Sequence, residues 1–215
     1  MDNAELVLTA LVIVCGVGTA AAQALERRTV VYVLKPLTTF LILMLSIMVP
    51  APVSRFYQTA VAVRLGFSIV GDVFLMFRRI PRWIMLGGVF FLCAHLVYLP
   101  ALGRVAGLQV SPAVVIPFVL YAVVWVVVLL PRLTPQLRLP IAIYTVVLVS
   151  TGWLAAEQVL QSADPRVVTI FAAMLLFILS DSVLGYNRFV KQGIRLEPLV
   201  LVLYFAAQLL TALTV

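Results

Sequence analysis

The sequence predicts an all-α integral membrane protein with eight transmembrane helices. Of its 215 residues, 64% are hydrophobic and 11% are charged, and the mean hydropathy is +1.18. Soluble domains average about 45–50% apolar and about 25% charged residues, so lipid must be the solvent for most of this chain. Apolar stretches that approach the roughly 20 residues needed to span a bilayer recur along the sequence.

The predicted spans lie between charged residues, prolines or polar clusters, which mark the ends of apolar runs. In chain order, the first breaks fall at the arginine pair 27–28, the prolines in 50–52 and the arginine–proline cluster 78–82. Later breaks carry Arg104, the prolines in 131–135, Arg166 and the basic residues of 188–195. The spans are expected at Leu6–Ala24, Val30–Val49, Phe56–Phe77, Trp83–Leu102, Pro112–Leu130, Leu139–Leu160, Val167–Tyr186 and Pro198–Val215.

The distribution of basic residues predicts how the chain crosses the membrane. The first, third, fifth and seventh loops hold ten lysines and arginines, whereas the other three loops hold three and the tails hold none. The positive-inside rule then puts both termini on the non-cytoplasmic side. The net charge of +7 follows from this topology, so we expect anionic lipid headgroups and no nucleic acid as partners. Minimal loops favour a bacterial inner (plasma) membrane.

Two further expectations concern the chain as a whole. Asp2 and Glu5 precede the first span where a signal peptide would carry basic residues, so we expect that span to be retained. Cys15 and Cys93 lie within apolar runs, and we expect both to be free thiols.

The chain is expected to form a single domain, 1–215, that contains an internal repeat. Residues 69–75 (IVGDVFL) align with residues 178–184 (ILSDSVL), which places Asp72 over Asp181. Four spans separate the two segments, so both run in the same direction through the membrane. This suggests a parallel four-plus-four repeat with halves 1–110 and 111–215. The alternative is that apolar helices resemble one another through composition alone.

Ionisable residues inside the predicted spans are the candidate functional groups. Each costs about 2.5–3.5 kcal/mol at mid-bilayer on insertion scales, so such groups usually face a cavity. Lys35, Asp72 and Asp181 lie at one depth, about 7–8 Å below the cytoplasmic surface at a helical rise of about 1.5 Å per residue. The strong candidates are Lys35, Asp72, His95 and Asp181.

Two other charges in the spans have open interpretations. Arg64 lies eight residues before Asp72 and either shares its helical face or snorkels outward. Glu157 lies near the outer end of its span and is expected to reach water.

Two carboxylates that share one lysine leave a net negative site, which favours retention of a proton by one of them. Such a pair supplies an acid and a base at neutral pH. The alternative is a buried ion pair that only holds helices together, and His95 alternatively is a hydrogen-bonded core residue. A single histidine without a cysteine pair argues against zinc. No Gly-x-Ser-x-Gly elbow is present, and we expect neither metal nor cofactor.

Four segments in this order resemble the YhhN-like family of multi-pass membrane proteins. They are residues 35–39 (KPLTT), 71–76 (GDVFLM), 94–98 (AHLVY) and 180–184 (SDSVL). Tyr144 and residues 187–189 (NRF) also resemble family positions, whereas Arg64 departs from the family pattern.

The resemblance implies a lysoplasmalogenase, which hydrolyses the vinyl ether bond of 1-alkenyl lysophospholipids to a fatty aldehyde and a glycerophospho-ethanolamine or -choline. Protonation of the β-carbon would create an oxocarbenium ion to which water adds. This chemistry needs a protonated acid beside an anion that stabilises the cation or activates water. The implied catalytic pair is Asp72 and Asp181. The implied substrate-binding residues are Lys35 (for tuning the acids or holding phosphate), His95, Tyr98 and Tyr144 (lining the pocket and ordering water), and Asn187 and Arg188 (contacting the headgroup).

A second function fits the same residues. A proton-coupled transporter of small molecules or lipids would use Asp72, Asp181 and Lys35 as a relay, and a parallel repeat with intramembrane acids suits it equally.

Overall fold

The computed structural model describes residues 3–49, 52, 54–77, 81–106, 110–191 and 196–215. The described residues form eight α-helices and no strand. A 3₁₀ turn, Leu130–Arg132, follows α5, and a π-helical turn, Tyr186–Val190, follows α7. The helices are α1 (Asn3–Ala24), α2 (Arg28–Met48), α3 (Arg55–Met76), α4 (Pro81–Ala106), α5 (Pro112–Leu129), α6 (Pro135–Gln161), α7 (Pro165–Gly185) and α8 (Glu197–Leu213).

Seven helices, α1 to α7, are long and apolar enough to cross a membrane. The eighth, α8, is also apolar but has only 17 residues. Each predicted span coincides with one helix apart from residues at its ends, so the prediction of a multi-pass helical membrane protein is confirmed. Cys15 and Cys93 are free thiols, as predicted.

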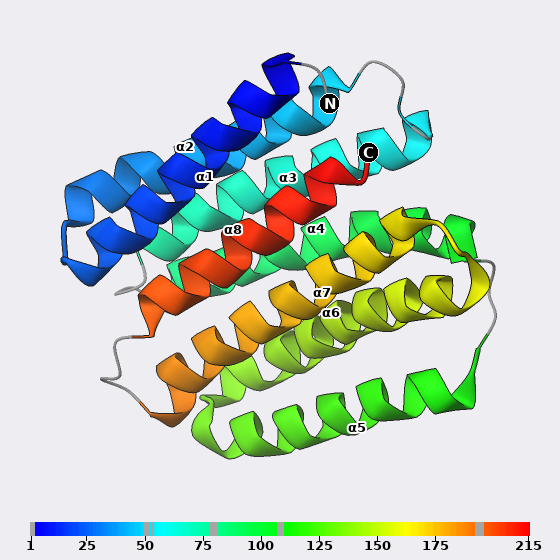
Figure 1. Cartoon of the computed structure of the whole chain (residues 1–215). Helices are drawn as coiled ribbons and strands as arrows, with labels where there is room; N and C mark the ends of the chain where they lie inside the picture. Colours follow the sequence, from blue (N-terminus) through cyan, green and yellow to red (C-terminus); the bar gives the residue numbers. More distant parts are fainter. Residues whose placement is uncertain (1–2, 50–51, 53, 78–80, 107–109, 192–195) are drawn as a thin grey trace.

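Six of the helices form a closed ring. Around it, α2 packs on α3, α3 on α4, α4 on α6, α6 on α7, α7 on α8, and α8 on α2. Outside this ring, α1 covers α2 and α8, and α5 lies beside α6 at the edge of the bundle (Figure 1). The helices run up and down, so both termini lie at the same end (Figure 1).

Prolines and short polar side chains set where several helices begin. Proline occupies the first turn of α5, α6, α7 and α8, where its missing N–H leaves no bond unmade. Ser54 caps α3 by accepting from the N–H of Tyr57 at 3.4 Å. Asp164 caps α7 by accepting from the N–H of Arg166 at 2.9 Å.

A glycine pair brings α3 and α4 into close contact directly beside Asp72. A Cβ atom on Gly71 would lie 2.8 Å from the Phe91 ring and 3.3 Å from the carbonyl oxygen of Gly87. A Cβ on Gly87 would similarly meet Leu75 at 2.8 Å. Small residues at such crossings let membrane helices pack closely, and here they fix α3, and with it Asp72, against α4.

The structure decides between the two interpretations of Arg64 and overturns one expectation about Glu157. Arg64 does not snorkel outward, because its side chain is 0% exposed inside the bundle, as is that of Ser68 between it and Asp72. Glu157 does not reach water: it is also 0% exposed, and it accepts hydrogen bonds from the Ser111 N–H at 2.8 Å and Trp153 Nε1 at 3.0 Å. The Ser111 bond joins the start of α5 to α6, and the Trp153 bond lies within α6; together they account for the burial of this carboxylate.

Candidate active site

A large cavity opens between the ring helices, with a volume of about 1580 Å³. Its lining reaches from the middle of the bundle to the end that carries the loops near 25–28, 129–134 and 185–189. Lys35, Asp72 and Asp181, which we predicted at one depth, all line it. Four arginines, each in or beside a loop predicted to be cytoplasmic, line its mouth: Arg28, Arg82, Arg132 and Arg188.

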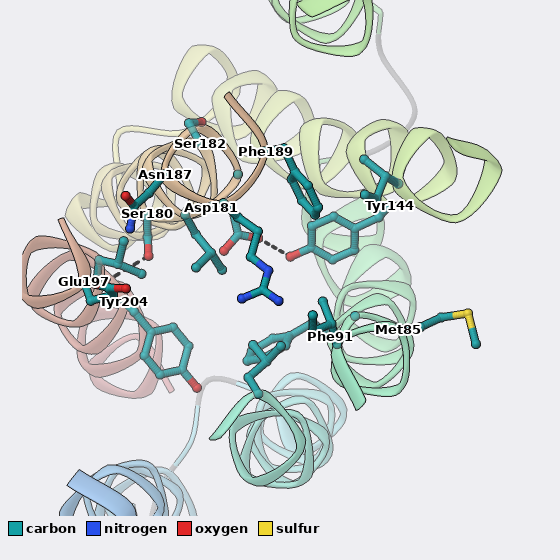
Figure 2. A pocket seen from close by; sticks show the side chains of 18 of the residues that line it. Met85, Phe91, Tyr144, Ser180, Asp181, Ser182, Asn187, Phe189, Glu197 and Tyr204 are labelled. Carbon is teal, nitrogen blue, oxygen red and sulfur yellow. Dashed lines mark hydrogen bonds between the residues drawn. The ribbon is translucent and has the colours of Figure 1, made fainter. Parts of the chain in front are cut away.

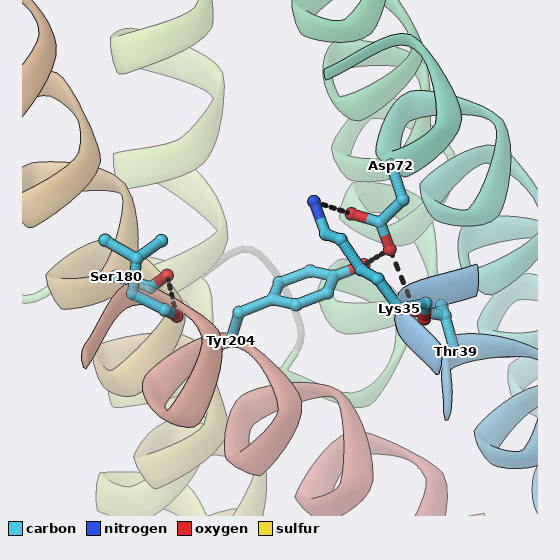
Figure 3. Close-up of polar contacts among 6 residues, drawn as sticks. Lys35, Thr39, Asp72, Ser180 and Tyr204 are labelled. Atoms are coloured by element: carbon cyan, nitrogen blue, oxygen red, sulfur yellow. Dashed lines mark hydrogen bonds and ion pairs between the residues drawn. The ribbon is translucent and has the colours of Figure 1, made fainter. Parts of the chain in front are cut away.

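Asp72 is held by three donors (Figure 3). Lys35 Nζ lies 2.9 Å from Oδ1, while the hydroxyls of Thr39 and Tyr204 each donate to Oδ2 at 2.8 Å. Asp72 itself is 1% exposed. A carboxylate that receives several hydrogen bonds and an ion pair is stabilised in its charged form.

The elements that position these donors come from distant parts of the sequence. Lys35 and Thr39 are four residues apart on α2 and therefore share one helical face. Tyr204 comes from α8, whose contact with both α2 and α3 brings its hydroxyl to the carboxylate. Lys35 Nζ also lies 5.9 Å from the centre of the Tyr204 ring.

Asp181 has a different environment. Its Oδ2 accepts a hydrogen bond from the hydroxyl of Tyr144 on α6, and the two side chains point toward each other across the cavity lining (Figure 2). Among the described residues, no other hydrogen bond and no ion pair reaches this carboxyl group. The neighbouring Ser182 is bonded instead to Tyr121 and to the carbonyl of Ile178.

His95 and Tyr98, which were expected to line the pocket, are not among the residues that line this cavity. Both are 0% exposed and lie deeper in the bundle. His95 Nδ1 is 3.4 Å from the Thr151 hydroxyl, and its ring packs edge-on against Phe177 with centres 4.7 Å apart. The Tyr98 hydroxyl lies 2.6 Å from that of Tyr57. Phe91, one helical turn before His95 on the same face of α4, does line the cavity, so His95 and Tyr98 differ from it in their depth along the helix.

Arg64 changes the charge of the site. Its Nη1 donates to Gln208 Oε1 at 2.7 Å, and its Cζ lies 5.0 Å and 5.2 Å from the ring centres of Tyr98 and Phe177. Arg64 therefore adds a second buried cation to the bundle, although it does not line the cavity that holds Lys35 and the two carboxyl groups.

Asn187 and Arg188 lie in the π-helical turn after α7 and line the cavity near its mouth. The side-chain carbonyl oxygen of Asn187 is buried and has no hydrogen-bond partner among the described residues. It is therefore available to a donor on a bound molecule.

Tyr204 and Thr39 were not predicted as site residues. Thr39 follows Lys35 by one helical turn, a spacing that signals a shared face. Tyr204 gave a weaker signal, because it lies in an apolar run with no charged residue beside it. For metals, the described residues bring no three His, Cys, Asp or Glu side chains together.

These features define a class: helical multi-pass membrane proteins with a cavity that holds two acidic side chains and carries arginines at its mouth. The chain belongs to the YhhN family, whose model matches residues 30–215. It is 31% identical over 161 residues to lysoplasmalogenase TMEM86A of Bos taurus, a match that covers 73% of this chain and 65% of the relative.

Two further relatives carry the same enzyme name. The chain is 30% identical to lysoplasmalogenase TMEM86B of Sus scrofa over 69% of its length, and 30% identical to the Homo sapiens protein over 68%. It spans 59% of each of these relatives, so all three matched relatives are covered by less than two thirds. No solved structure matches the chain.

Proposed function

We propose that this protein is a lysoplasmalogenase-type hydrolase in which Asp181 is the general acid and Asp72 the anion. The observation that carries the proposal is the unequal bonding of two carboxyl groups in one cavity. Asp72 receives three donors, which favours the carboxylate. Asp181 receives one, from Tyr144, and retains its proton more readily. Tyr144 bonds Oδ2, so Oδ1 carries the proton that is transferred.

The reaction then needs no group beyond the two acids and water. Asp181 protonates the β-carbon of the vinyl ether, the double bond supplies the electron pair, and the ether oxygen shares the positive charge as an oxocarbenium ion. The Asp72 carboxylate stabilises that cation electrostatically. Water adds to the α-carbon and returns a proton to Asp181, as an acid that becomes a base does in glycoside hydrolysis. The hemiacetal collapses to a fatty aldehyde, and the glycerol oxygen leaves with a proton.

The cavity mouth supports a phosphate-bearing substrate. Arg28, Arg82, Arg132 and Arg188 surround an opening whose interior is largely apolar. A single-chain lysophospholipid matches this distribution when its phosphate lies at the arginines and its alkenyl chain lies inside. The unpartnered oxygen of Asn187 suits a glycerol hydroxyl or an ethanolamine ammonium.

We also propose that the chain has the predicted membrane orientation and the parallel four-plus-four repeat. The ring contacts α2–α3, α3–α4 and α4–α6 have counterparts in α6–α7, α7–α8 and α8–α2, as a parallel repeat requires. In the orientation that the loop charges predict, both termini lie on the non-cytoplasmic side and the mouth faces the cytoplasm. We propose a bacterial inner membrane as the location.

The direct test is release of fatty aldehyde from a 1-alkenyl lysophospholipid by the purified protein in detergent. Asp72→Asn and Asp181→Asn keep the side-chain size but remove the ionisable group. We expect each to lower kcat at least a hundredfold, which corresponds to about 2.7 kcal/mol of barrier. Asp164→Asn is the matched control, since it makes the same chemical change at a helix cap where asparagine serves as well.

Two results would contradict the proposal. Folded wild-type protein that releases no aldehyde would exclude this substrate. Full activity in either aspartate variant would exclude the paired-acid mechanism. Proton-dependent uptake of a solute into proteoliposomes without chemical change would instead identify the aspartates as a transport relay.

A further inference from the structure

Arg64 is a buried cation whose bonding is incomplete. The side chain is 0% exposed, and only Nη1 has a hydrogen-bond partner, Gln208. Its Nε and Nη2 groups have none among the described residues. The guanidinium packs against the rings of Tyr98 and Phe177. A charge in the core of a membrane protein is expensive and marks a functional role by default.

The acid that balances Arg64 can be identified by elimination within the described spans. Asp72 is already paired with Lys35 at 2.9 Å. Glu157 is bonded to Ser111 and Trp153 where α5 meets α6. Asp181 remains, and no cation contacts it within ion-pair distance among the described residues.

Phe177 links Arg64 to the turn of α7 that precedes Asp181. Arg64 lies 5.2 Å from the Phe177 ring, and Phe177 precedes Asp181 by four residues on the same face of α7. The guanidinium is therefore about one helical turn deeper than the carboxyl group. A cation about one helical turn from a carboxyl group acts on it through space and favours its ionised form.

Several other groups face Asp181. Tyr144 on α6 donates to it, and the charges of Lys35 on α2 and Asp72 on α3 act on it as well. Tyr121 on α5 is also within electrostatic reach. Lys35 and Asp72 form an ion pair, so their opposite charges largely cancel at Asp181. Arg64 contacts no acid among the described residues, so its positive charge at Asp181 is not offset in this way.

We propose that Arg64 is a positioning residue that stabilises the Asp181 carboxylate formed when the acid donates its proton. This inference rests on the function proposed above. Arg64 does not line the cavity, so it acts through Asp181 and does not touch the substrate. A fixed cation that is already in place when negative charge develops stabilises the transition state without reorganisation.

The test compares Arg64→Gln with Arg64→Lys in the full-length protein. Activity requires protonated Asp181, so the rate falls as pH rises. Without the cation the carboxylate is less stable, and we expect this alkaline limb to move to higher pH by about one unit, a tenfold change in ionisation. We expect kcat at the optimum to fall about tenfold and KM to stay constant. Arg64→Lys retains the charge and should leave the limb within a few tenths of a unit.

The control is Arg104→Gln, which removes the same charge from an exposed side chain that packs 4.0 Å from the Phe56 ring centre. A second readout is independent of turnover. Infrared difference spectra of the protonated carboxyl group, assigned by their loss in Asp181→Asn, follow the titration of Asp181 directly. They also remain interpretable if Arg64→Gln lowers the yield of folded protein.

The outcomes separate this inference from the proposed function. An infrared titration of Asp181 that Arg64→Gln leaves unmoved overturns the role of Arg64, whatever the substrate. A shifted titration in a protein that releases no aldehyde keeps the coupling between Arg64 and Asp181 and refutes the hydrolase. A loss of activity with an unchanged pH limb would mean that Arg64 only supports the fold, and it would also overturn the inference.

Discussion

Replacing Lys35 by methionine tests its ion pair with Asp72 in the cavity lining. In the wild type, Lys35 Nζ and Asp72 Oδ1 are 2.9 Å apart, and the two side chains are 13% and 1% exposed. At an effective dielectric constant near 20 such a contact is worth up to about 6 kcal/mol before desolvation. Removing one partner of a buried pair costs about 3–5 kcal/mol, because the other charge stays buried.

Protonation of Asp72 limits that loss. At about pH 7, protonating a carboxyl group of ordinary acidity costs about 4 kcal/mol, so Lys35→Met should lower the free energy of unfolding by about 3–4 kcal/mol. Near pH 5 the same protonation costs about 1.5 kcal/mol, and the loss should shrink accordingly. The loss in the free energy of unfolding shrinks as pH falls because the folded variant would bind a proton that the unfolded chain releases.

The assay is reversible unfolding in detergent mixtures, followed by far-ultraviolet circular dichroism at both pH values. Lys191→Met, at an exposed position after α7, is the matched control. The double variant Lys35→Met with Asp72→Asn should recover stability to within about 1 kcal/mol of Asp72→Asn alone, yet stay inactive. A loss below about 1 kcal/mol at neutral pH, or one that does not change with pH, would refute the reasoning.

Three further predictions follow from single contacts. Tyr144→Phe removes the only hydrogen bond recorded for Asp181 among the described residues, and aldehyde release should fall about tenfold with little change in thermal stability. Gly71→Ala should lower the free energy of unfolding by about 1–3 kcal/mol, because the new methyl group would lie 2.8 Å from the Phe91 ring; Gly66→Ala, with nothing within 4 Å, should be neutral or stabilising in the same unfolding assay. Arg188→Gln should raise KM severalfold for a phosphate-bearing substrate and leave kcat unchanged, in steady-state kinetics at two salt concentrations. Unchanged values in the first and third cases, or equal losses in the two glycine variants, would contradict these contacts.

The course of the chain through the membrane was predictable because lipid imposes one rule on every span. Apolar runs ended by prolines and arginines had to be helices, and each predicted span has its helix. The sequence also predicted that Lys35, Asp72 and Asp181 lie close in depth, since that expectation depends only on the rise of a helix. All three line one cavity.

The faces of the helices were harder to predict than their positions. His95 and Tyr98 share a face of α4 with the cavity-lining Phe91, but how deep the cavity extends along that face depends on how α4 packs against α6. Tyr204 reaches Asp72 only because α8 contacts α2 and α3. The sequence left open whether Arg64 shares the face of Asp72 or snorkels outward. The choice required its neighbours on other helices, Gln208 and Phe177.

The one-ended shape of the cavity has a consequence for the fate of the products. Its described lining carries arginines at the mouth and apolar side chains within, with the two aspartates at the boundary. In the proposed reaction the bond that breaks lies at that boundary, so an amphiphile is divided into one water-soluble and one lipid-soluble part. Each part partitions into a different phase, and the two no longer meet at the concentration needed for recombination. The membrane itself would then drive the reaction forward by keeping the products apart.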